Sequence, residues 1–312
     1  MSNTRSSRSA TGFVSAVSAF LIWGLSPIFY KALRPVPPFE ILMHRMVWSF
    51  LFLVPLLLIV GRWNTFIATF RDRKTLRILF GTTLLVGSNW FLFIWAINND
   101  HILQASLGYY TNPLVNVLLA MVFLGERLRR LQIVAVLVAF AGVVYMTLSV
   151  GEFPWVALAL AFSFAFYGLL RKTAPVGAIE GLSIETLLLF APAAGYLWYL
   201  NRQGLGAFAS ITWQTDLLLV ACALVTAVPL LLFTVGARRL SLITIGFLQY
   251  LAPSCTFLLA VFVYGEPFSI AQAVTFCLIW LALAIFSTDA MVIWKARPKA
   301  GQGTRSLSRP AD

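Results

Sequence analysis

Ten long apolar stretches follow one another along this chain, and each is long enough to cross a lipid bilayer as a helix. A spanning helix needs about 20 largely apolar residues, and the alternating pattern of a membrane β-strand is absent from these stretches. The sequence therefore predicts an all-α integral membrane protein with ten transmembrane helices. We expect these helices at residues 11–30, 39–60, 77–97, 102–124, 131–149, 153–170, 181–200, 215–235, 242–264 and 268–293.

The composition argues against a soluble protein. Hydrophobic residues make up 60% of the 312 residues and charged residues only 11%, against about 25% charged in an ordinary soluble domain. The net charge of +12 resides in short basic clusters between the apolar stretches, which is typical of loops that flank membrane helices. We therefore expect a lipid bilayer as the surroundings and no nucleic acid as a partner.

The distribution of Lys and Arg predicts how the chain is oriented. If the N-terminus is cytoplasmic, only Lys31, Arg34 and Arg202 fall in loops on the outer side, and Arg45 lies inside an apolar stretch. All other members of the 23 Lys and Arg residues then fall on the cytoplasmic side, as the positive-inside rule requires. Both termini are therefore expected in the cytoplasm.

Sequence features recur at a spacing of 140 residues, so the chain reads as one unit written twice. Pro113 is followed thirteen positions later by Glu126, and Pro253 is followed thirteen positions later by Glu266. We interpret both glutamates as residues that end a helix or cap the next one. Further matches are Glu40 with Glu180, Phe93 with Phe233, Tyr110 with Tyr250, Gln132 with Gln272 and Val134 with Val274.

Each repeat contains five expected helices, and five is an odd number. The second repeat must therefore enter the membrane with the opposite polarity, which is the inverted-repeat architecture of many secondary transporters. We expect a cytoplasmic N-terminal segment at 1–10, the first repeat at 11–149, the second repeat at 150–293 and a disordered basic cytoplasmic tail at 294–312.

One face of the fourth expected helix is polar or small although it lies inside the bilayer. Its residues follow one another at helical spacings, and so do those of the matching face of the ninth helix. The two faces are Ser106, Tyr109, Asn112 and Asn116, and Gly246, Gln249, Ala252 and Thr256. They either pack the two helices closely together or line a substrate pathway. Pro113 and Pro253, beside these faces, are either hinges or static bends.

Three ionisable side chains, those of His44, Arg45 and Glu185, lie inside expected helices. A charge at the bilayer centre costs at least about 2.5–3.5 kcal/mol, so such residues usually face the interior of a bundle. Arg45 and Glu185 are also 140 residues apart, and whether they interact is left open by the sequence. Our hypothesis is that Arg45 attracts an anionic group of a substrate and that Glu185 binds a cation or carries a proton. The alternative is that both side chains snorkel to nearby membrane interfaces.

Three further residues are assigned to the predicted pathway. The amide of Asn89 needs hydrogen-bonding partners inside the bilayer, and Trp90 follows it directly. Tyr250 follows Gln249 in the ninth expected helix. We expect these residues to contribute to the same pathway as the polar faces.

Motifs of catalysis are not found in this sequence. It contains no HExxH or GxSxG motif, no carboxylate pair within an expected helix and no phosphate-binding glycine-rich loop. Cys222, Cys255 and Cys277 lie in apolar stretches and form no CxxC pair. We therefore expect a protein that is not an enzyme, with no catalytic residues, no metal and no cofactor. The alternatives to a transporter are a channel or receptor-like membrane protein and, less favoured, a membrane-embedded enzyme.

Several strings of residues are specific enough to suggest a family. They are FEILMHR at 39–45, NWFLFIWA at 89–96, ASLGYY at 105–110, NPLVN at 112–116, LGER at 124–127, AFSFAFYG at 161–168, and Phe247, Gln249 and Tyr250. In these strings the chain resembles the EamA family of the drug/metabolite transporter superfamily and, within it, the RarD subfamily. The resemblance extends over nearly the whole chain, up to about Lys295.

This resemblance implies ten helices in two inverted EamA repeats in a bacterial inner membrane. It also implies a permease that moves a small organic metabolite or drug-like molecule, often outward, by alternating access. We expect helices 1–4 and 6–9 to surround the substrate and helices 5 and 10 to support them from outside. A homodimer is an open alternative to a monomer, and Ala282, in place of a counterpart to Gly142, weakens the case for a contact through helix 10.

Overall fold

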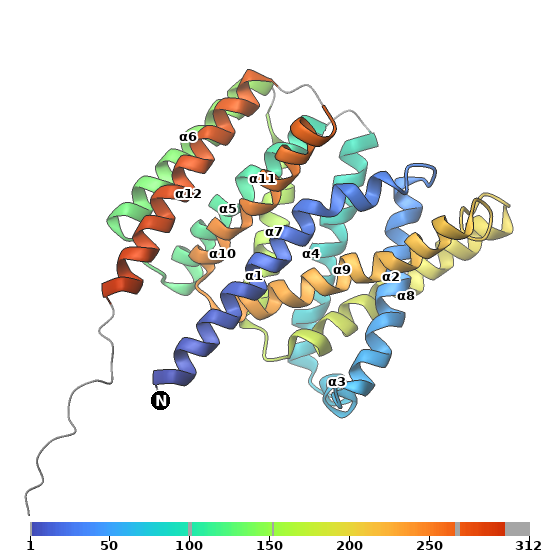
Figure 1. The fold of residues 1–312 in the computed structure, drawn as a ribbon. Coiled ribbons are helices and arrows are strands. Elements are labelled where there is room, and N and C mark those ends of the chain that lie inside the picture. Colours follow the sequence, from blue (N-terminus) through green and yellow to red (C-terminus); the bar gives the residue numbers. More distant parts are fainter. Residues whose placement is uncertain (1, 99–101, 152, 266–268, 297–312) are drawn as a thin grey trace, which may run out of the picture.

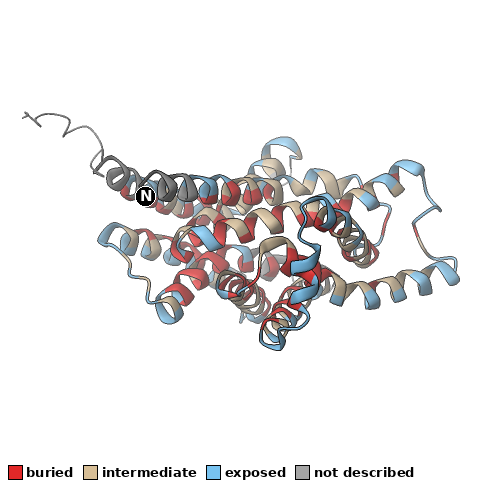
Figure 2. Ribbon diagram, turned by 90° about the horizontal axis from the view of Figure 1, so that it is seen from below, coloured by how far each residue is buried: buried red, intermediate tan, exposed pale blue. Residues whose placement is uncertain are grey.

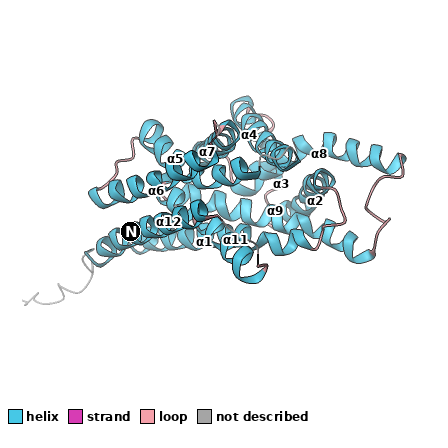
Figure 3. Cartoon of the chain, turned by 90° about the horizontal axis from the view of Figure 1, so that it is seen from above, coloured by secondary structure: helices cyan, strands magenta, loops and turns pink. Residues whose placement is uncertain are grey.

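The computed structural model describes residues 2–98, 102–151, 153–265 and 269–296. Glu266 and most of the predicted tail at 294–312 lie outside these residues. Within them, every element of regular structure is a helix (Figure 3). For some helical residues, Ser106 among them, only the backbone is described.

The chain folds into a bundle of helices whose buried residues lie where the helices face one another (Figure 2). Ten helical segments are long and apolar enough to cross a membrane, which confirms the predicted fold class. The elements are α1 (Ser2–Lys31), α2 (Pro38–Ile59), α3 (Trp63–Thr69), α4 (Arg73–Asn98), α5 (Ile102–Leu124), α6 (Arg130–Val150), α7 (Trp155–Thr173), α8 (Ala178–Arg202), α9 (Trp213–Arg239), α10 (Leu242–Gln249), α11 (Leu251–Leu258), the π-helix η1 (Leu259–Val263) and α12 (Ile270–Ala296).

The helices extend further than the apolar stretches do. α1 begins at Ser2, although its membrane-spanning part begins at Ala10, and α9 continues to Arg239. The reason is that bilayer thickness limits the apolar stretch but does not end the hydrogen-bonded helix. The short helix α3, between the second and third spans, was not predicted because it has only seven residues.

The ninth span is interrupted, whereas its counterpart in the first repeat is not. α10 ends at Gln249 and α11 begins at Leu251, two residues before Pro253. Proline has no N–H, so the carbonyl of Gln249 lacks its usual helical donor at Pro253. Pro113 removes the equivalent bond in α5, yet α5 runs unbroken from Ile102 to Leu124. The two matching prolines therefore have different local consequences.

Contacts between helices recur when the two halves of the chain are exchanged. The packing of α1 on α9 matches that of α7 on α4, the packing of α5 on α7 matches that of α11 on α1, and the packing of α2 on α9 matches that of α8 on α4. The pairs α2 with α8, α5 with α10, and α6 with α12 each join corresponding helices. The bundle thus has the contacts of two similar five-helix units.

The fifth and tenth spans, α6 and α12, pack against each other at one edge of the bundle (Figure 1). A Cβ on Gly142 would lie 3.3 Å from the Cβ of Leu278, and the hydroxyl of Thr275 donates a 3.1 Å hydrogen bond to the carbonyl of Gly142. Ala282 is fully buried. The small residues of these two helices therefore allow them to approach each other within one chain.

Two buried glutamates in matching positions each hold a loop of the opposite half. Glu40, in the first turn of α2, accepts a 2.7 Å hydrogen bond from the backbone N–H of Ala207, in the loop before α9. Glu180, in the first turn of α8, lies 3.6 Å from the guanidinium of Arg62, in the loop before α3. Each carboxylate therefore contacts the connection between the second and third spans of the other repeat.

Asp72 caps the N-terminus of α4 outside the membrane spans. Its carboxylate accepts hydrogen bonds from the hydroxyl of Thr75 and from the backbone N–H of Lys74. The hydrogen bond from the Thr75 hydroxyl is the main reason that the pKa of Asp72 lies below its usual value. This cap fixes the start of α4, the helix that carries Thr82, Asn89 and Trp90.

Candidate functional site

The side chain of Arg45, from the second turn of α2, reaches three other helices. Its Nε donates a 3.0 Å hydrogen bond to the hydroxyl of Thr226 on α9. Its guanidinium carbon lies 5.0 Å from the ring centroid of Trp90 on α4 and 5.6 Å from that of Tyr30 on α1. Rings at these distances stabilise the cation through their π faces. Arg45 is only partly buried and, among the described residues, has no acidic partner.

Tyr109 of α5 is a further member of the site around Arg45. The Tyr109 side chain lies near Arg45 and packs edge to face on Phe93, with the ring centroids 5.7 Å apart. Tyr109 is 50% exposed, so its side chain is not sealed within the packed part of the bundle. We name the set of Tyr30, Arg45, Trp90, Tyr109 and Thr226 the arginine site.

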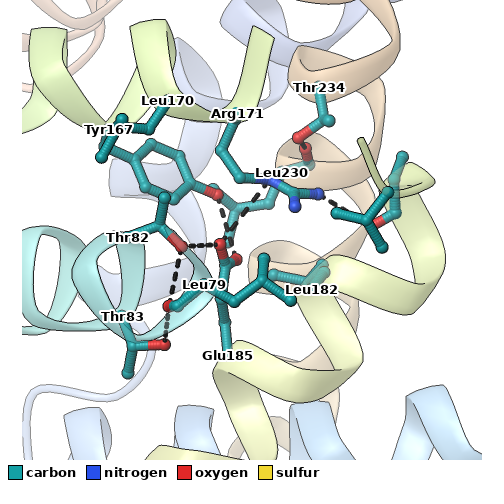
Figure 4. Close-up of polar contacts among 12 residues, drawn as sticks. Leu79, Thr82, Thr83, Tyr167, Leu170, Arg171, Leu182, Glu185, Leu230 and Thr234 are labelled. Atoms are coloured by element: carbon teal, nitrogen blue, oxygen red, sulfur yellow. Dashed lines mark hydrogen bonds and ion pairs between the residues drawn. The ribbon is translucent and has the colours of Figure 1, made fainter. Parts of the chain in front are cut away.

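Glu185 of α8 lies in a second, sealed cluster (Figure 4). Its carboxylate accepts hydrogen bonds from the hydroxyls of Thr82 at 2.5 Å and Tyr167 at 3.4 Å. The Nε of Arg171 lies 3.6 Å from the same carboxylate, and Glu185 and Arg171 are each 1% exposed. We name these four residues the Glu185 cluster.

Glycine makes room for the cluster. A Cβ at Gly181, one helical turn before Glu185, would overlap the Arg171 guanidinium. The Nη2 of Arg171 donates a 3.1 Å hydrogen bond to the carbonyl of Ala178, while its Nη1 has no hydrogen-bond partner. The short connection between α7 and α8 thus folds Arg171 back onto the first turns of α8.

Arg171 is a member of this cluster that the sequence did not predict, because it directly follows the apolar stretch 153–170 and counts among the cytoplasmic cations. The structure instead buries it in the last turn of α7, and it is Arg171, not Arg45, that pairs with Glu185. The available signal was helical spacing, because Tyr167 lies four residues before Arg171 and so shares its face. The snorkelling alternative for Glu185 does not fit its nearly complete burial.

His44 does not belong to the arginine site. Its Nδ1 accepts a 3.2 Å hydrogen bond from the indole of Trp48, and its Nε2 lies 3.7 Å from Glu40. The imidazole ring also packs on Phe208 at 5.4 Å. Adjacent helical residues point in different directions, so His44 faces the loop before α9 while Arg45 faces the bundle.

The amides of the predicted polar faces form a buried network. Asn112 donates to the carbonyl of Ala161 at 3.1 Å. Asn116 donates to Asn112 at 3.1 Å and to Gln249 of α10 at 2.6 Å. A Cβ on Gly246 would lie 2.9 Å from the carbonyl of Pro113. At this depth the two faces are packed together, whereas the face of α5 is accessible at Tyr109.

Three further predicted residues make contacts between helices. Asn89 donates to the carbonyl of Leu160 at 2.9 Å and to Ser163 at 2.8 Å, which ties α4 to α7. The hydroxyl of Tyr250 donates to the carbonyl of Tyr110 at 3.1 Å. Thr256 donates to the carbonyl of Gly24 at 3.2 Å, which ties α11 to α1. The side chain of Ser106 lies outside the described part of the structure.

Glu126 caps a helix of the other repeat, not the helix that follows it in sequence. Its carboxylate accepts hydrogen bonds from the backbone N–H groups of Leu242, at 2.8 Å, and Ile243, at 3.1 Å, at the start of α10. Lys172 of α7 donates to the carbonyls of Ala237, at 2.8 Å, and Leu240 at the end of α9. Both charges match the helix ends that they contact, and together they clamp the turn between α9 and α10.

The described residues contain no group of three His, Cys, Asp or Glu side chains arranged to hold a metal ion. Cys222 is buried, Cys255 partly buried and Cys277 exposed, and all three are free thiols. The chemistry that the site offers is therefore that of one cation, hydroxyls, amides and aromatic rings. Such groups can bind and orient an organic molecule.

Comparisons with known proteins identify the family. The sequence profile of the EamA-like transporter family matches residues 10–148. An uncharacterized transporter of Vibrio cholerae is 50% identical over 294 residues, covering 94% of this chain and 95% of the relative. Protein RarD of Escherichia coli is 47% identical over 280 residues, covering 90% of this chain and 95% of the relative.

A solved structure is similar in fold, with a TM-score of 0.67 at 21% identity, over 92% of this chain and 99% of the other. At that identity the similarity concerns the fold alone. The relatives over nearly the full length and the ten apolar helices together describe a multi-pass membrane transporter. The chain is therefore a RarD-type member of the EamA-like transporter family.

Proposed function

We propose that this chain is a secondary transporter that moves a small organic metabolite or drug-like molecule across the bacterial inner membrane by alternating access, in the direction of export. The observation that carries the proposal is the arginine site. It combines residues from α1, α2, α4 and α5 of the first half with Thr226 of the second half. A site at the junction of two repeats is where such transporters bind their substrates.

The two repeats, at 11–149 and 150–293, are inverted relative to each other in this proposal. The exchangeable helix contacts support it, because the second and seventh spans, the fourth and ninth, and the fifth and tenth each pack on each other. The excess of Lys and Arg in alternate loops supports cytoplasmic termini. α6 and α12, packed together at the edge, then support the remaining eight spans.

We propose that the end of the bundle where α7 meets α9 is the closed one. α7 packs on α9, whereas α1 and α4, the corresponding pair, make no comparable contact among the described residues. The Glu126 and Lys172 clamp and the Glu185 cluster lie at the end where α7 meets α9. We assign this closed end to the cytoplasmic side, and alternating access requires it to open while the opposite end closes.

Glu185 remains a candidate for coupling in this proposal, by carrying a proton or binding a cation when its pairing with Arg171 changes. The pathway further includes His44, Asn89, Trp90, Asn112, Asn116, Gln249, Tyr250 and Thr256, with Ser106 on the same face of α5, and Pro113 and Pro253 serve as hinges. Substrate contact is proposed for the accessible arginine site, and the buried amides position the helices that surround it.

Counterflow in proteoliposomes tests the proposed function. Vesicles are loaded with a metabolite extract or with chloramphenicol and are assayed for exchange against a labelled external compound. Chloramphenicol is a suitable probe because a Pseudomonas aeruginosa relative is named "Chloramphenicol-sensitive protein RarD". Saturable exchange that requires the protein supports a carrier. Conductance without saturation indicates a channel, and a new product indicates an enzyme. Arg45→Ala and Glu185→Gln proteins that reach the membrane are expected to lose most of the exchange.

A further inference from the structure

We propose that the arginine site binds the acid group of an organic anion and that the planar body of this molecule lies against the surrounding aromatic rings. This inference rests on the proposed transport function and names the class of its substrate. It assigns Arg45 as the residue that selects for the acid group, and Trp90, Tyr30 and Tyr109 as the walls. Thr226 positions the guanidinium.

Arg45 differs from other arginines of the described chain in having no acidic partner. Arg171, which is fully buried, pairs with Glu185 at 3.6 Å. Even the exposed cations Arg62 and Arg129 have acidic partners at 3.6 Å. Arg45 lies within a membrane span, and in the described chain its hydrogen-bond and cation–π partners are one hydroxyl and two rings. An uncompensated cation in such surroundings is costly, so an anion that enters the site is stabilised by it.

The two halves of the chain carry opposite charges at the position of Arg45. Arg45 and Glu185 are counterparts at a spacing of 140 residues, and the counterpart of Arg171 is Lys31. In the second half, a cation therefore neutralises the buried carboxylate. In the first half, the residue that corresponds to Arg171 is Lys31, which is itself a cation and therefore cannot neutralise Arg45. Among the described residues, Glu185 has a counter-ion and Arg45 has none, so a bound anion would supply the missing charge.

The geometry of the guanidinium is suited to an acid group. Its Nε is occupied by Thr226, whereas its two terminal nitrogens have no hydrogen-bond partner among the described residues and are not sealed from solvent as the Nη1 of Arg171 is. Two adjacent N–H donors of a planar guanidinium match the two oxygens of a carboxylate. Thr226 is 2% exposed, so the orientation that it imposes is fixed by packing.

The walls of the site favour a planar apolar body. The Trp90 and Tyr30 ring centroids lie 5.0 and 5.6 Å from the guanidinium carbon, and Tyr109 of the same site is 50% exposed. Aromatic rings bind flat apolar groups by offset or edge-to-face stacking, and the Tyr hydroxyls add hydrogen bonds. A ligand with an acid group and a ring would satisfy both parts of the site, while a simple inorganic anion would leave the rings uncovered.

Matched triplets of compounds test this proposal on the full-length protein in detergent. The probes are benzoate, phenylacetate and indole-3-acetate, each with its amide and its amine, and affinity is measured from the concentration dependence of the thermal unfolding midpoint. We expect at least one acid to bind the wild type on the order of tenfold more tightly than its amide, because the charge-assisted pair is lost in the amide. Arg45→Gln should abolish this preference.

Arg202→Gln is the matched control, because Arg202 also lies over a ring, 5.4 Å from the Trp198 centroid, but at an exposed end of α8. It should keep the preference for acids. Thr226→Val retains the Arg45 charge and should reduce the preference only partly, which allows a conclusion even if Arg45→Gln does not fold. The proposal is overturned if no acid binds better than its amide, or if the preference survives in a folded Arg45→Gln or unchanged in Thr226→Val.

Transport assays distinguish the proposed anion site from the broader proposal that the protein is a transporter. Acid-selective binding without counterflow would keep the anion site and reject the transporter. Saturable counterflow of amides or amines that Arg45→Gln leaves intact would keep the transporter and reject the anion site.

Discussion

The hydroxyl of Thr82 donates a 2.5 Å hydrogen bond to the carboxylate of Glu185, and the residues at the corresponding positions of the other half are Cys222 and Arg45. Arg45 on α2 donates a hydrogen bond to Thr226 on α9, the helix that also carries Cys222, so in both halves the second or seventh span contacts the third span of the opposite repeat. The same place in the two units therefore holds a sealed ion pair in one and an accessible cation in the other.

The Glu185 cluster predicts a strong penalty for single substitutions. Arg171→Met leaves a buried carboxylate without its cation, and Glu185→Gln leaves a buried guanidinium without its anion, so each should lower stability by about 3–5 kcal/mol. The double variant Arg171→Met with Glu185→Met should be less destabilised than either single variant. Unfolding in detergent, followed by fluorescence-detected size-exclusion chromatography after heating, measures the three effects.

Arg129→Gln provides the control for this pair. Arg129 also lies 3.6 Å from a carboxylate, that of Asp289, but its side chain is 54% exposed. Its loss should therefore change stability by no more than about 1 kcal/mol. Equal effects of Arg129→Gln and Arg171→Met would show that burial does not determine the strength of the Glu185 pair.

Two glycines of α8 give a matched test of the space that Arg171 occupies. Gly181→Ala would place a Cβ onto the guanidinium, and we expect a loss of about 1–3 kcal/mol of stability from the forced rearrangement. Gly195→Ala, in the same helix, has no atom within 4 Å of the added Cβ and should be neutral or stabilising by up to about 1 kcal/mol. Melting curves of the two proteins that coincide would contradict the structure around Gly181.

The sequence predicted the ten membrane helices because their signal is local and large. Apolar length alone identifies a span, and the break in the ninth span lies beside the proline that was expected to disturb it. Partners of single side chains depend instead on contacts between distant helices. Arg171 pairs with Glu185 only because a four-residue connection, 174–177, turns the chain back and Gly181 leaves room for the guanidinium. No pattern within either helix contains that information.

The interface between α5 and α10 also shows what helical spacing in the sequence cannot predict. Helical spacing correctly placed Asn112, Asn116 and Gln249 on facing surfaces, where they form hydrogen bonds. The spacing did not separate packing from access, because both require small or polar residues. Burial in the assembled bundle distinguishes packed from accessible positions, because Asn116 is 1% exposed and Tyr109 is 50% exposed.

The different surroundings of the two prolines predict different roles. Pro253→Ala would give the carbonyl of Gln249 a helical donor and join α10 to α11, so we expect a continuous ninth span and a several-fold lower counterflow rate if the break is a hinge. Pro113 already lies in an unbroken helix, and Pro113→Ala should have the smaller effect on the rate. Hydrogen exchange of the backbone at 249–254 should fall in Pro253→Ala. Unchanged counterflow in that variant would mean that the break is a static bend.

The clamp on the turn between α9 and α10 predicts a local opening that leaves the rest of the bundle intact. Glu126→Ala removes both acceptors of the Leu242 and Ile243 N–H groups, and loss of a helix cap costs about 0.5–2 kcal/mol. Exchange of those two amides with deuterium should therefore accelerate by about two- to thirty-fold. Thr212→Ala is the control, because Thr212 caps the N-terminus of α9 and should leave α10 unchanged. If the closed end is held by Glu126, the exchange rate should rise in Glu126→Ala alone, and an increase of equal size in Thr212→Ala would indicate general loosening of the bundle instead.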